Sequence, residues 1–310
     1  MLKVETGQPV EKHEESCPKW LATLQSPFLS VSRNIRGWHW LTVLSLDAPL
    51  VALVWQDFFA RSFAASLLPA HRVVLGFSVW LAYVADRWLD GRQLPGGAAI
   101  TLRHDFARRF ARPIAIAWVF VLTGNVLLAL VELSREEFLA GLGLAAAVFA
   151  YLAAGHKRSI LQRFGWLKEF SVALLISVGA VFFVFLQTSQ LTAGHWVGLG
   201  LLMLLCFLNC AVVSVWEKDV DQCQAQPSLA IRFGVTQSHL MAFAGLLLLL
   251  QIGIGLLARE APLRWVAFAG SCSAAGVLAL LSQAGSIGLE TRRLLVDAAL
   301  LSPLAFIWFL

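Results

Sequence analysis

The sequence predicts an all-α protein that crosses a membrane several times. Of its 310 residues, 58% are hydrophobic and only 14% are charged, whereas soluble domains have about 45–50% apolar and about 25% charged residues. The apolar residues are also grouped into segments long enough to span a bilayer, which takes about 20 residues. This composition excludes a soluble enzyme, a secreted disulfide scaffold and a disordered chain.

We expect nine membrane-spanning segments, which together form a polytopic bundle. All should be helices, because a helix satisfies its own backbone hydrogen bonds in lipid. Pro69, Pro113 and Pro262 near the starts of three segments agree with these boundaries. The predicted spans are residues 39–60, 69–88, 113–132, 138–155, 168–188, 195–216, 237–258, 263–283 and 293–310.

Residues 1–38 are predicted to lie outside this bundle. The first part is polar and acidic, without the positive start and apolar core of a signal peptide. Trp20, Leu21, Leu24 and Phe28 then follow at near-helical spacing, which is typical of a short helix on the membrane surface. The chain therefore divides into a tail with an interfacial helix, 1–38, and a transmembrane domain, 39–310.

The positive charges predict the orientation of the bundle. When the N-terminal tail, the loops and the ends of the predicted spans are counted, the 24 Lys and Arg residues divide into nineteen on one face and five on the other. Because cytoplasmic loops carry the excess of Lys and Arg, the N-terminus and the loops after even-numbered spans should be cytoplasmic, in an inner (plasma) membrane. A pI of about 9.2 could indicate nucleic acid binding, but basic residues placed between apolar segments favour the membrane explanation.

The five cysteines are interpreted as reduced packing thiols. Cys206, Cys210 and Cys272 lie inside apolar segments, and Cys223 lies just after one. This distribution fits neither a disulfide framework nor a zinc site.

Two pairs of acidic residues close predicted spans on the cytoplasmic side. Asp86 and Asp90 end the second span, and Glu217 and Asp221 end the sixth, with Asp219 between them. Residues four apart share one face of a helix, where like charges repel unless a cation lies between them. A single pair of this kind is most simply a solvated helix end, but two pairs in equivalent places favour a site.

The chemistry of the two pairs indicates a site for a diphosphate with an apolar tail. Carboxylates combined with phosphate oxygens are the ligands that Mg²⁺ prefers, and guanidinium groups match phosphate geometry. The candidate metal ligands and catalytic residues are Asp86, Asp90, Glu217 and Asp221, with Asp219 as a further metal ligand; the candidate diphosphate ligands are Arg87, Arg92, Lys157, Arg158 and Lys168.

Two polar residues inside predicted spans are further candidates. Asp47 lies within the first span, where an ionisable group is costly and often functional. Asn209 lies two turns before Glu217 and could point into the same cavity, although both residues could equally serve a hydrogen bond within the bundle.

Several segments resemble motifs of the UbiA superfamily of intramembrane prenyltransferases. Ala85-Asp86-Arg87-x-x-Asp90-Gly91 resembles its first aspartate motif, and 217–221, followed by Ser228 and Phe233-Gly234, is similar to the second. Tyr151 with Lys157-Arg158 and Lys168-Glu169 is similar to the segment that joins the family's fourth and fifth helices, and 46–49 to its first-helix motif. Some family positions differ: Ala82 and Tyr83 replace Asn and Asp, Glu217 replaces Asp, and Ala48 replaces Arg.

The resemblance implies a nine-helix fold and Mg²⁺-dependent transfer of a prenyl group from a prenyl diphosphate to an aromatic or other small acceptor. The expected partners are the prenyl diphosphate, a lipid-soluble product and membrane lipid; neither nucleic acid nor an obligate protein partner is expected. Two alternatives stay open. The prenyl cation could cyclise without an acceptor, as in a terpene cyclase, or the same scaffold could be a transporter or binding protein without catalysis.

Overall fold

The computed structural model describes residues 37–93, 106, 109–156, 167–223 and 226–310. Within these residues all regular structure is helical and no β-strand is present. The predicted all-α class is therefore confirmed for the described part of the chain. The predicted tail and interfacial helix fall almost entirely outside it.

Six helices are long and apolar enough to cross a membrane. They correspond to the third to eighth predicted spans, with boundaries that differ by a few residues. They are α6 (Ala111–Glu132), α7 (Arg135–His156), α9 (Leu167–Gln187), α10 (Ala193–Trp216), α13 (Gln237–Leu257) and α14 (Ala261–Ser282).

The first two predicted spans differ from this pattern. The first is broken into α2 (His39–Val43) and α3 (Asp47–Ser62), and at the break Ser45 has a φ of 60°. Such a positive φ is uncommon outside glycine and ends the first helix. The second is the continuous 25-residue helix α4 (Pro69–Gln93). It is long enough to cross a bilayer but less apolar than the six, because it carries charged residues near both of its ends.

The last predicted span is also interrupted. Helix α15 (Leu289–Ala299) has only 11 residues and is followed by the 3-10 turn η4 (Ser302–Ala305). Pro303 cannot donate a backbone hydrogen bond, which disfavours a longer helix here. The segment nevertheless runs back along α14, since the Ser302 hydroxyl donates to the Ala269 carbonyl at 2.6 Å and the Phe306 ring lies 6.2 Å from that of Trp265. Of the nine predicted spans, six are thus matched by described helices that are long and apolar enough to cross a membrane.

Three short elements connect the long helices. Helices α11 (Lys218–Cys223) and α12 (Leu229–Phe233) lie between α10 and α13, and the turn η3 (Ala284–Ser286) lies between α14 and α15. Gly234, with a φ of 61°, ends α12 in the left-handed conformation that favours glycine. The connection packs against α10, and Asp221 and residues 226–228 of it belong to the candidate site described below.

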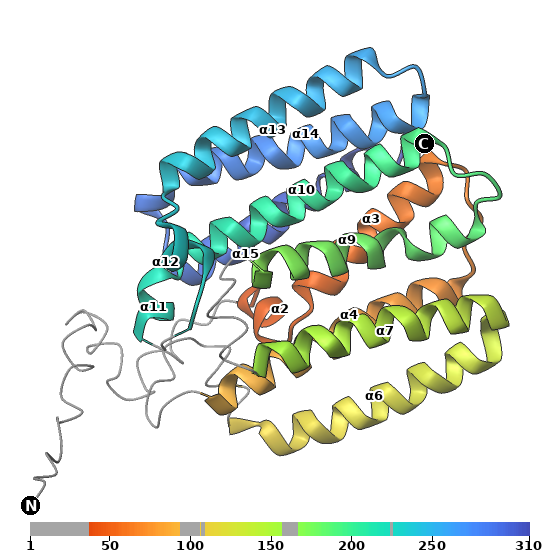
Figure 1. Ribbon diagram of the computed structural model, residues 1–310, viewed down its shortest axis with the longest axis horizontal. Helices are drawn as coiled ribbons and strands as arrows, with labels where there is room; N and C mark the ends of the chain where they lie inside the picture. Colours follow the sequence, from red (N-terminus) through yellow and green to blue (C-terminus); the bar gives the residue numbers. More distant parts are fainter. Residues whose placement is uncertain (1–36, 94–105, 107–108, 157–166, 224–225) are drawn as a thin grey trace, which may run out of the picture.

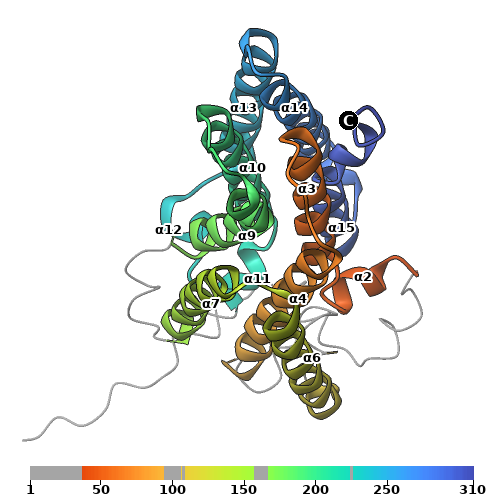
Figure 2. The ribbon, with the colours of Figure 1, turned by 90° about the vertical axis from the view of Figure 1, so that its right-hand side faces the viewer.

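The long helices pack side by side (Figure 1). Seen end-on in Figure 2, α9 and α10 lie on one side of the bundle and α3 and α15 on the other, with α4 nearby. Trp55, Phe58 and Phe59 of α3 form the centre of the core together with apolar residues of α10, such as Leu202 and Leu205. The polar cavity described below lies between these two sides.

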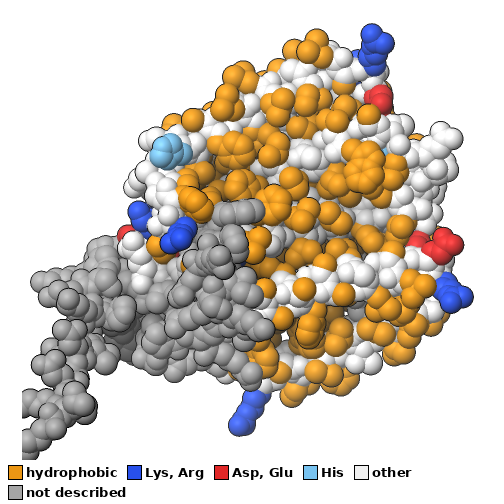
Figure 3. Space-filling model, viewed as in Figure 1, with side chains coloured by type: hydrophobic (Ala, Val, Ile, Leu, Met, Phe, Trp, Pro, Cys, Tyr) orange, Lys and Arg blue, Asp and Glu red, His pale blue; other side chains and the backbone are white. Residues whose placement is uncertain are grey.

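The outer surface of the bundle is apolar. In Figure 3 hydrophobic side chains cover the middle of the molecule, while charged side chains gather toward its two ends. In α6 only 11% of the most apolar window is buried inside the protein, and Phe120 and Val131 are 75% and 78% exposed. A soluble protein rarely exposes so large an apolar surface, which fits a polytopic membrane protein.

Polar contacts join the helices at the end of the bundle that lies away from the cavity. The Arg72 Nε lies 2.6 Å from the Asp57 Oδ1, and the buried His71 Nε2 lies 3.0 Å from the Glu137 Oε1. Gln187 donates to the same Glu137 oxygen at 2.6 Å. These contacts connect α3 with α4, α4 with α7, and α7 with α9.

Candidate functional site

A cavity of about 210 Å³ lies between α3, α4, α9, α10 and α15, and residues of α2 and α11 and residues 226–228 complete its wall. Small-molecule sites commonly have volumes of about 300–1,000 Å³. This space therefore suits the polar end of a lipid substrate better than a whole prenyl diphosphate. Its wall contains both acidic pairs that the sequence singled out.

The first acidic pair lies on the last turns of α4. Tyr151 of α7 donates its hydroxyl to the Asp86 Oδ1 at 3.4 Å, and the Lys168 Nζ of α9 lies 3.4 Å from the Asp90 Oδ2. Asp86, Asp90 and Lys168 all line the cavity. Side chains from two other helices, α7 and α9, therefore contact this pair.

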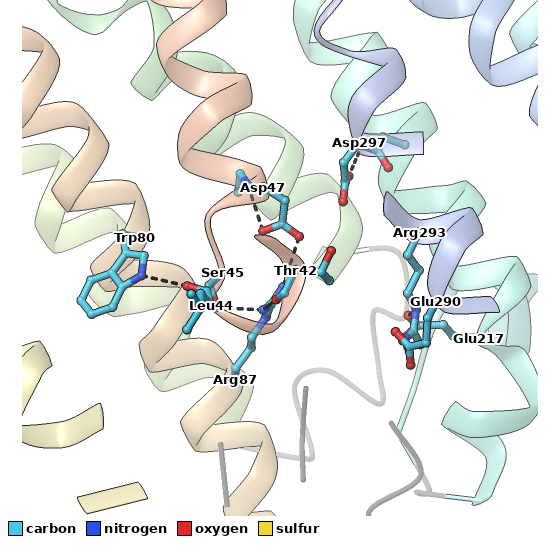
Figure 4. Close-up of polar contacts among 12 residues, drawn as sticks. Thr42, Leu44, Ser45, Asp47, Trp80, Arg87, Glu217, Glu290, Arg293 and Asp297 are labelled. Carbon is cyan, nitrogen blue, oxygen red and sulfur yellow. Dashed lines mark hydrogen bonds and ion pairs between the residues drawn. The ribbon is translucent and has the colours of Figure 1, made fainter. Parts of the chain in front are cut away.

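The second acidic pair is divided between two helices. Glu217 is the residue that caps the end of α10, and Asp221 lies in α11. Both line the cavity, whereas Asp219 is exposed on α11 and is not part of the lining. The buried Arg293 of α15 forms an ion pair with Glu217 and also lies 3.2 Å from the Glu290 Oε1 (Figure 4).

Arg87 lies beside the first acidic pair but holds the break between α2 and α3. Its guanidinium donates to the Thr42 carbonyl and to the Ser45 hydroxyl, the latter at 2.7 Å, and lies 3.5 Å from the Asp47 Oδ2 (Figure 4). Because these groups occupy much of the guanidinium, Arg87 is more restricted as a diphosphate ligand than its sequence position indicates.

Of the other four predicted diphosphate ligands, only Lys168 has a described side chain. Lys168 lines the cavity. The backbone of Arg92 belongs to the end of α4, but its side chain lies outside the described part, as do Lys157 and Arg158 altogether. For these three residues the assignment stays a prediction.

The inner wall of the cavity contains polar residues of which the sequence pointed to only two, Asp47 and Asn209. Asn209 donates through its Nδ2 to the Asp297 Oδ1 at 2.8 Å, and Thr42 and Tyr83 also line this space. Asp297 was missed because it lies in a segment that resembles an ordinary apolar span. An aspartate inside a predicted span was the available signal.

Glu169 has a structural part in this wall. Its Oε1 accepts a hydrogen bond at 2.9 Å from the backbone amide of Leu229, the first residue of α12. This contact satisfies one of the free amides at the start of a short helix. It fixes residues 226–228, which lie over the cavity, to α9.

The cavity has an excess of negative charge. Among the described residues in its lining, seven are acidic and three, Arg87, Lys168 and Arg293, are basic. Each of the three basic side chains forms an ion pair with a carboxylate. Carboxylates in excess of their cationic partners are a donor set that fits a divalent cation.

The fit to Mg²⁺ depends on the substrate as well as the protein. Among the described residues, no three His, Cys, Asp or Glu side chains come close enough together to form a metal site by themselves. Mg²⁺ usually binds one or two carboxylates together with substrate phosphates and water, and rarely a cage of protein ligands. Asp86, Asp90 and Asp221 suit that arrangement, whereas Glu217 would have to share its carboxylate with Arg293.

Comparisons with protein-family models, with curated proteins and with solved structures found no match. The likeness to UbiA-type motifs therefore depends on the residues themselves. Of these, Asp86, Arg87, Asp90, Lys168, Glu217, Asp221 and Ser228 line the same cavity.

Proposed function

We propose that this protein is an intramembrane prenyltransferase that transfers a prenyl group from a prenyl diphosphate to a small acceptor. The observation that supports this most strongly is that two acidic pairs, far apart in sequence, line one cavity between apolar helices. Lys168 lies in the same wall as a partner for phosphate oxygens. An apolar surface around a charged cavity is what a substrate with a charged head and a greasy tail requires.

In this proposal Asp86, Asp90 and Asp221 hold Mg²⁺, with Glu217 available when it is released from Arg293. When bound, the ion supplies positive charge for the departing diphosphate. Lys168 contacts the same phosphates, and Tyr151 orients the Asp86 carboxylate. The allylic C–O bond breaks, the diphosphate leaves with the electron pair, and a nucleophilic atom of the acceptor forms the new bond to the prenyl carbon and loses its proton.

The proposal includes the orientation and the number of crossings. The chain passes nine times across the bundle if the broken first and last segments are counted. The cavity mouth faces the cytoplasm of the inner (plasma) membrane, as the nineteen-to-five division of Lys and Arg favours. The prenyl tail leaves the small cavity between helices toward lipid.

The test uses purified full-length protein with labelled geranylgeranyl diphosphate and Mg²⁺. We expect diphosphate release that is lost in Asp86→Ala and in Asp221→Ala and retained in Asp219→Ala, which removes an exposed acid. No release from any prenyl diphosphate by correctly folded protein would overturn the proposal. Product analysis distinguishes transfer from cyclisation, because a cyclase forms its product without an acceptor.

A transporter is a second candidate function, and one observation favours it. The first and last segments are both broken, and Asp47 and Asp297 lie beside the breaks. Discontinuous helices with polar residues at the break are typical of transporter sites. Uptake of labelled prenyl diphosphate into proteoliposomes without diphosphate release would favour this function.

A further inference from the structure

Tyr83 lines the cavity about one helical turn deeper than the first acidic pair. It precedes Asp86 by three residues and Asp90 by seven, so the three residues share one face of α4, and all three line the cavity. The end of the cavity at Asp90 is its mouth. At 1.5 Å per residue, Tyr83 lies about 4.5 Å further from the mouth than Asp86 and about 10 Å further than Asp90.

The wall formed by α9 changes from charged to apolar in the same direction. The Lys168 Nζ lies 3.4 Å from the Asp90 Oδ2, which places these two residues at the same level. Val172 and Ile176 follow on the same face of α9, about 6 Å and 12 Å further from the mouth, and both line the cavity. On these two helices, the level of Tyr83 therefore separates a charged outer part from an apolar inner part.

The Tyr83 hydroxyl forms no hydrogen bond with the described part of the chain. The Arg87 guanidinium lies over the ring of Tyr83, 5.9 Å from its centroid. The phenol also interacts electrostatically with Cys210 of α10, another residue of the lining, so the side chain extends from α4 into the cavity. A tyrosine hydroxyl in such a place usually has a partner, and a ligand atom at this level would supply one.

A prenyl diphosphate has one polar atom that belongs at the level of Tyr83. When Asp86, Asp90 and Lys168 hold the two phosphates near the mouth, the ester oxygen between the inner phosphorus and the first prenyl carbon comes next, followed by the apolar chain. This oxygen receives the electron pair when the C–O bond breaks. A hydrogen-bond donor directed at an oxygen where negative charge develops is an effective catalytic group.

We propose that the Tyr83 hydroxyl donates a hydrogen bond to this ester oxygen and assists the departure of the diphosphate. The inference rests on the proposed function and adds a catalytic residue to it. The C–O bond breaks, the electron pair stays on the ester oxygen, and Tyr83 keeps its own proton, while the acceptor loses its proton as described above. Because the hydrogen bond strengthens as negative charge gathers on the oxygen, it accelerates the chemical step more than it improves binding.

The experiment compares two labelled donors with purified full-length protein and Mg²⁺. One is geranylgeranyl diphosphate, and the other is its S-thiolo analogue, in which sulfur replaces the ester oxygen and accepts hydrogen bonds only weakly. Tyr83→Phe should lower kcat for release from the oxygen donor by about 10²-fold, the scale of one lost oxyanion donor, with little change in KM. Release from the sulfur donor should scarcely change, so the ratio of the two rates narrows.

This ratio separates catalysis from structure. It is measured within one preparation, so it does not depend on the folded fraction of a variant. Tyr83→Phe keeps the ring beside Arg87 and should melt like the wild type. Tyr151→Phe is the matched control: its hydroxyl donates to Asp86, and its loss should lower release from both donors by the same factor.

Unchanged release from the oxygen donor in Tyr83→Phe, or an equal loss for both donors, would overturn the assignment of Tyr83 and leave the proposed enzyme intact. If the wild type releases no diphosphate from either donor, the proposed function fails and this assignment fails with it. A ratio that narrows in Tyr83→Phe and stays constant in Tyr151→Phe is the expected result.

Discussion

The Asn209 Nδ2 of α10 lies 2.8 Å from the Asp297 Oδ1 of α15. Together with the ion pair between Arg293 and Glu217, it gives α15 two polar connections to α10. A helix of only 11 residues has little stability of its own. These two contacts therefore hold the interrupted last segment against the cavity.

Arg293→Ala should strongly destabilise the protein. The Arg293 side chain is 2% exposed and pairs with both Glu217 and Glu290, and removing one partner of a buried ion pair leaves an uncompensated charge that costs about 3–5 kcal/mol. Thermal unfolding in detergent measures the loss. Arg259→Ala, which removes an exposed arginine between α13 and α14, is the matched control and should melt like the wild type.

Gly255→Val should separate α13 from α14. A Cβ at Gly255 would lie 2.9 Å from the Phe268 Cε1, whereas one at Gly245 on the same helix would meet nothing within 4 Å. Overpacking of this kind costs about 1–3 kcal/mol. Gly245→Val should therefore be tolerated, and equal melting temperatures for the two variants would contradict the packing described here.

The membrane location can be tested at the lipid-facing surface of α6. Phe120→Arg places a charge on an exposed apolar helix, which is unfavourable by about 2.5–3.5 kcal/mol at the centre of a span. We expect less protein in the membrane fraction than for Phe120→Leu. Equal amounts of both variants would indicate that this part of α6 does not face lipid.

Lys168 is expected to bind the diphosphate rather than only to neutralise Asp90, from which its Nζ lies 3.4 Å. Lys168→Ala should raise the KM for the prenyl diphosphate by about tenfold, the scale of one charged hydrogen bond. Lys168→Arg should recover part of this loss, and Lys218→Ala, outside the cavity lining, should have no effect. A lower melting temperature with an unchanged KM would mean that Lys168 is only structural.

The fold could be predicted from the sequence where apolar length alone decides it. The third to eighth spans are continuous apolar stretches, and six helices match them. The prediction that the first and last spans are single helices was wrong. Hydropathy does not reveal a turn such as the one at Ser45, or the effect of Pro303 on a helix.

The candidate site was predictable to a similar degree. Asp86, Asp90, Glu217 and Asp221 could be selected by their spacing at span ends, and all four line the cavity. The contacts of Arg87 with Ser45 and of Arg293 with Glu217 could not, because they depend on how distant segments pack. Arg293 is the first residue of the predicted span 293–310, and nothing in the sequence indicated that it is buried.

The measurement that tests the central claim most directly is a double-mutant cycle between the two acidic pairs. Diphosphate release from labelled geranylgeranyl diphosphate is compared for wild type, Asp86→Ala, Asp221→Ala and the double variant at saturating Mg²⁺. If both carboxylates act on one bound diphosphate, each single variant should lower kcat/KM by about 10³-fold and the double variant scarcely further, because residues that act as a unit are not additive. Losses that multiply, or single variants as active as the wild type, would contradict a shared substrate.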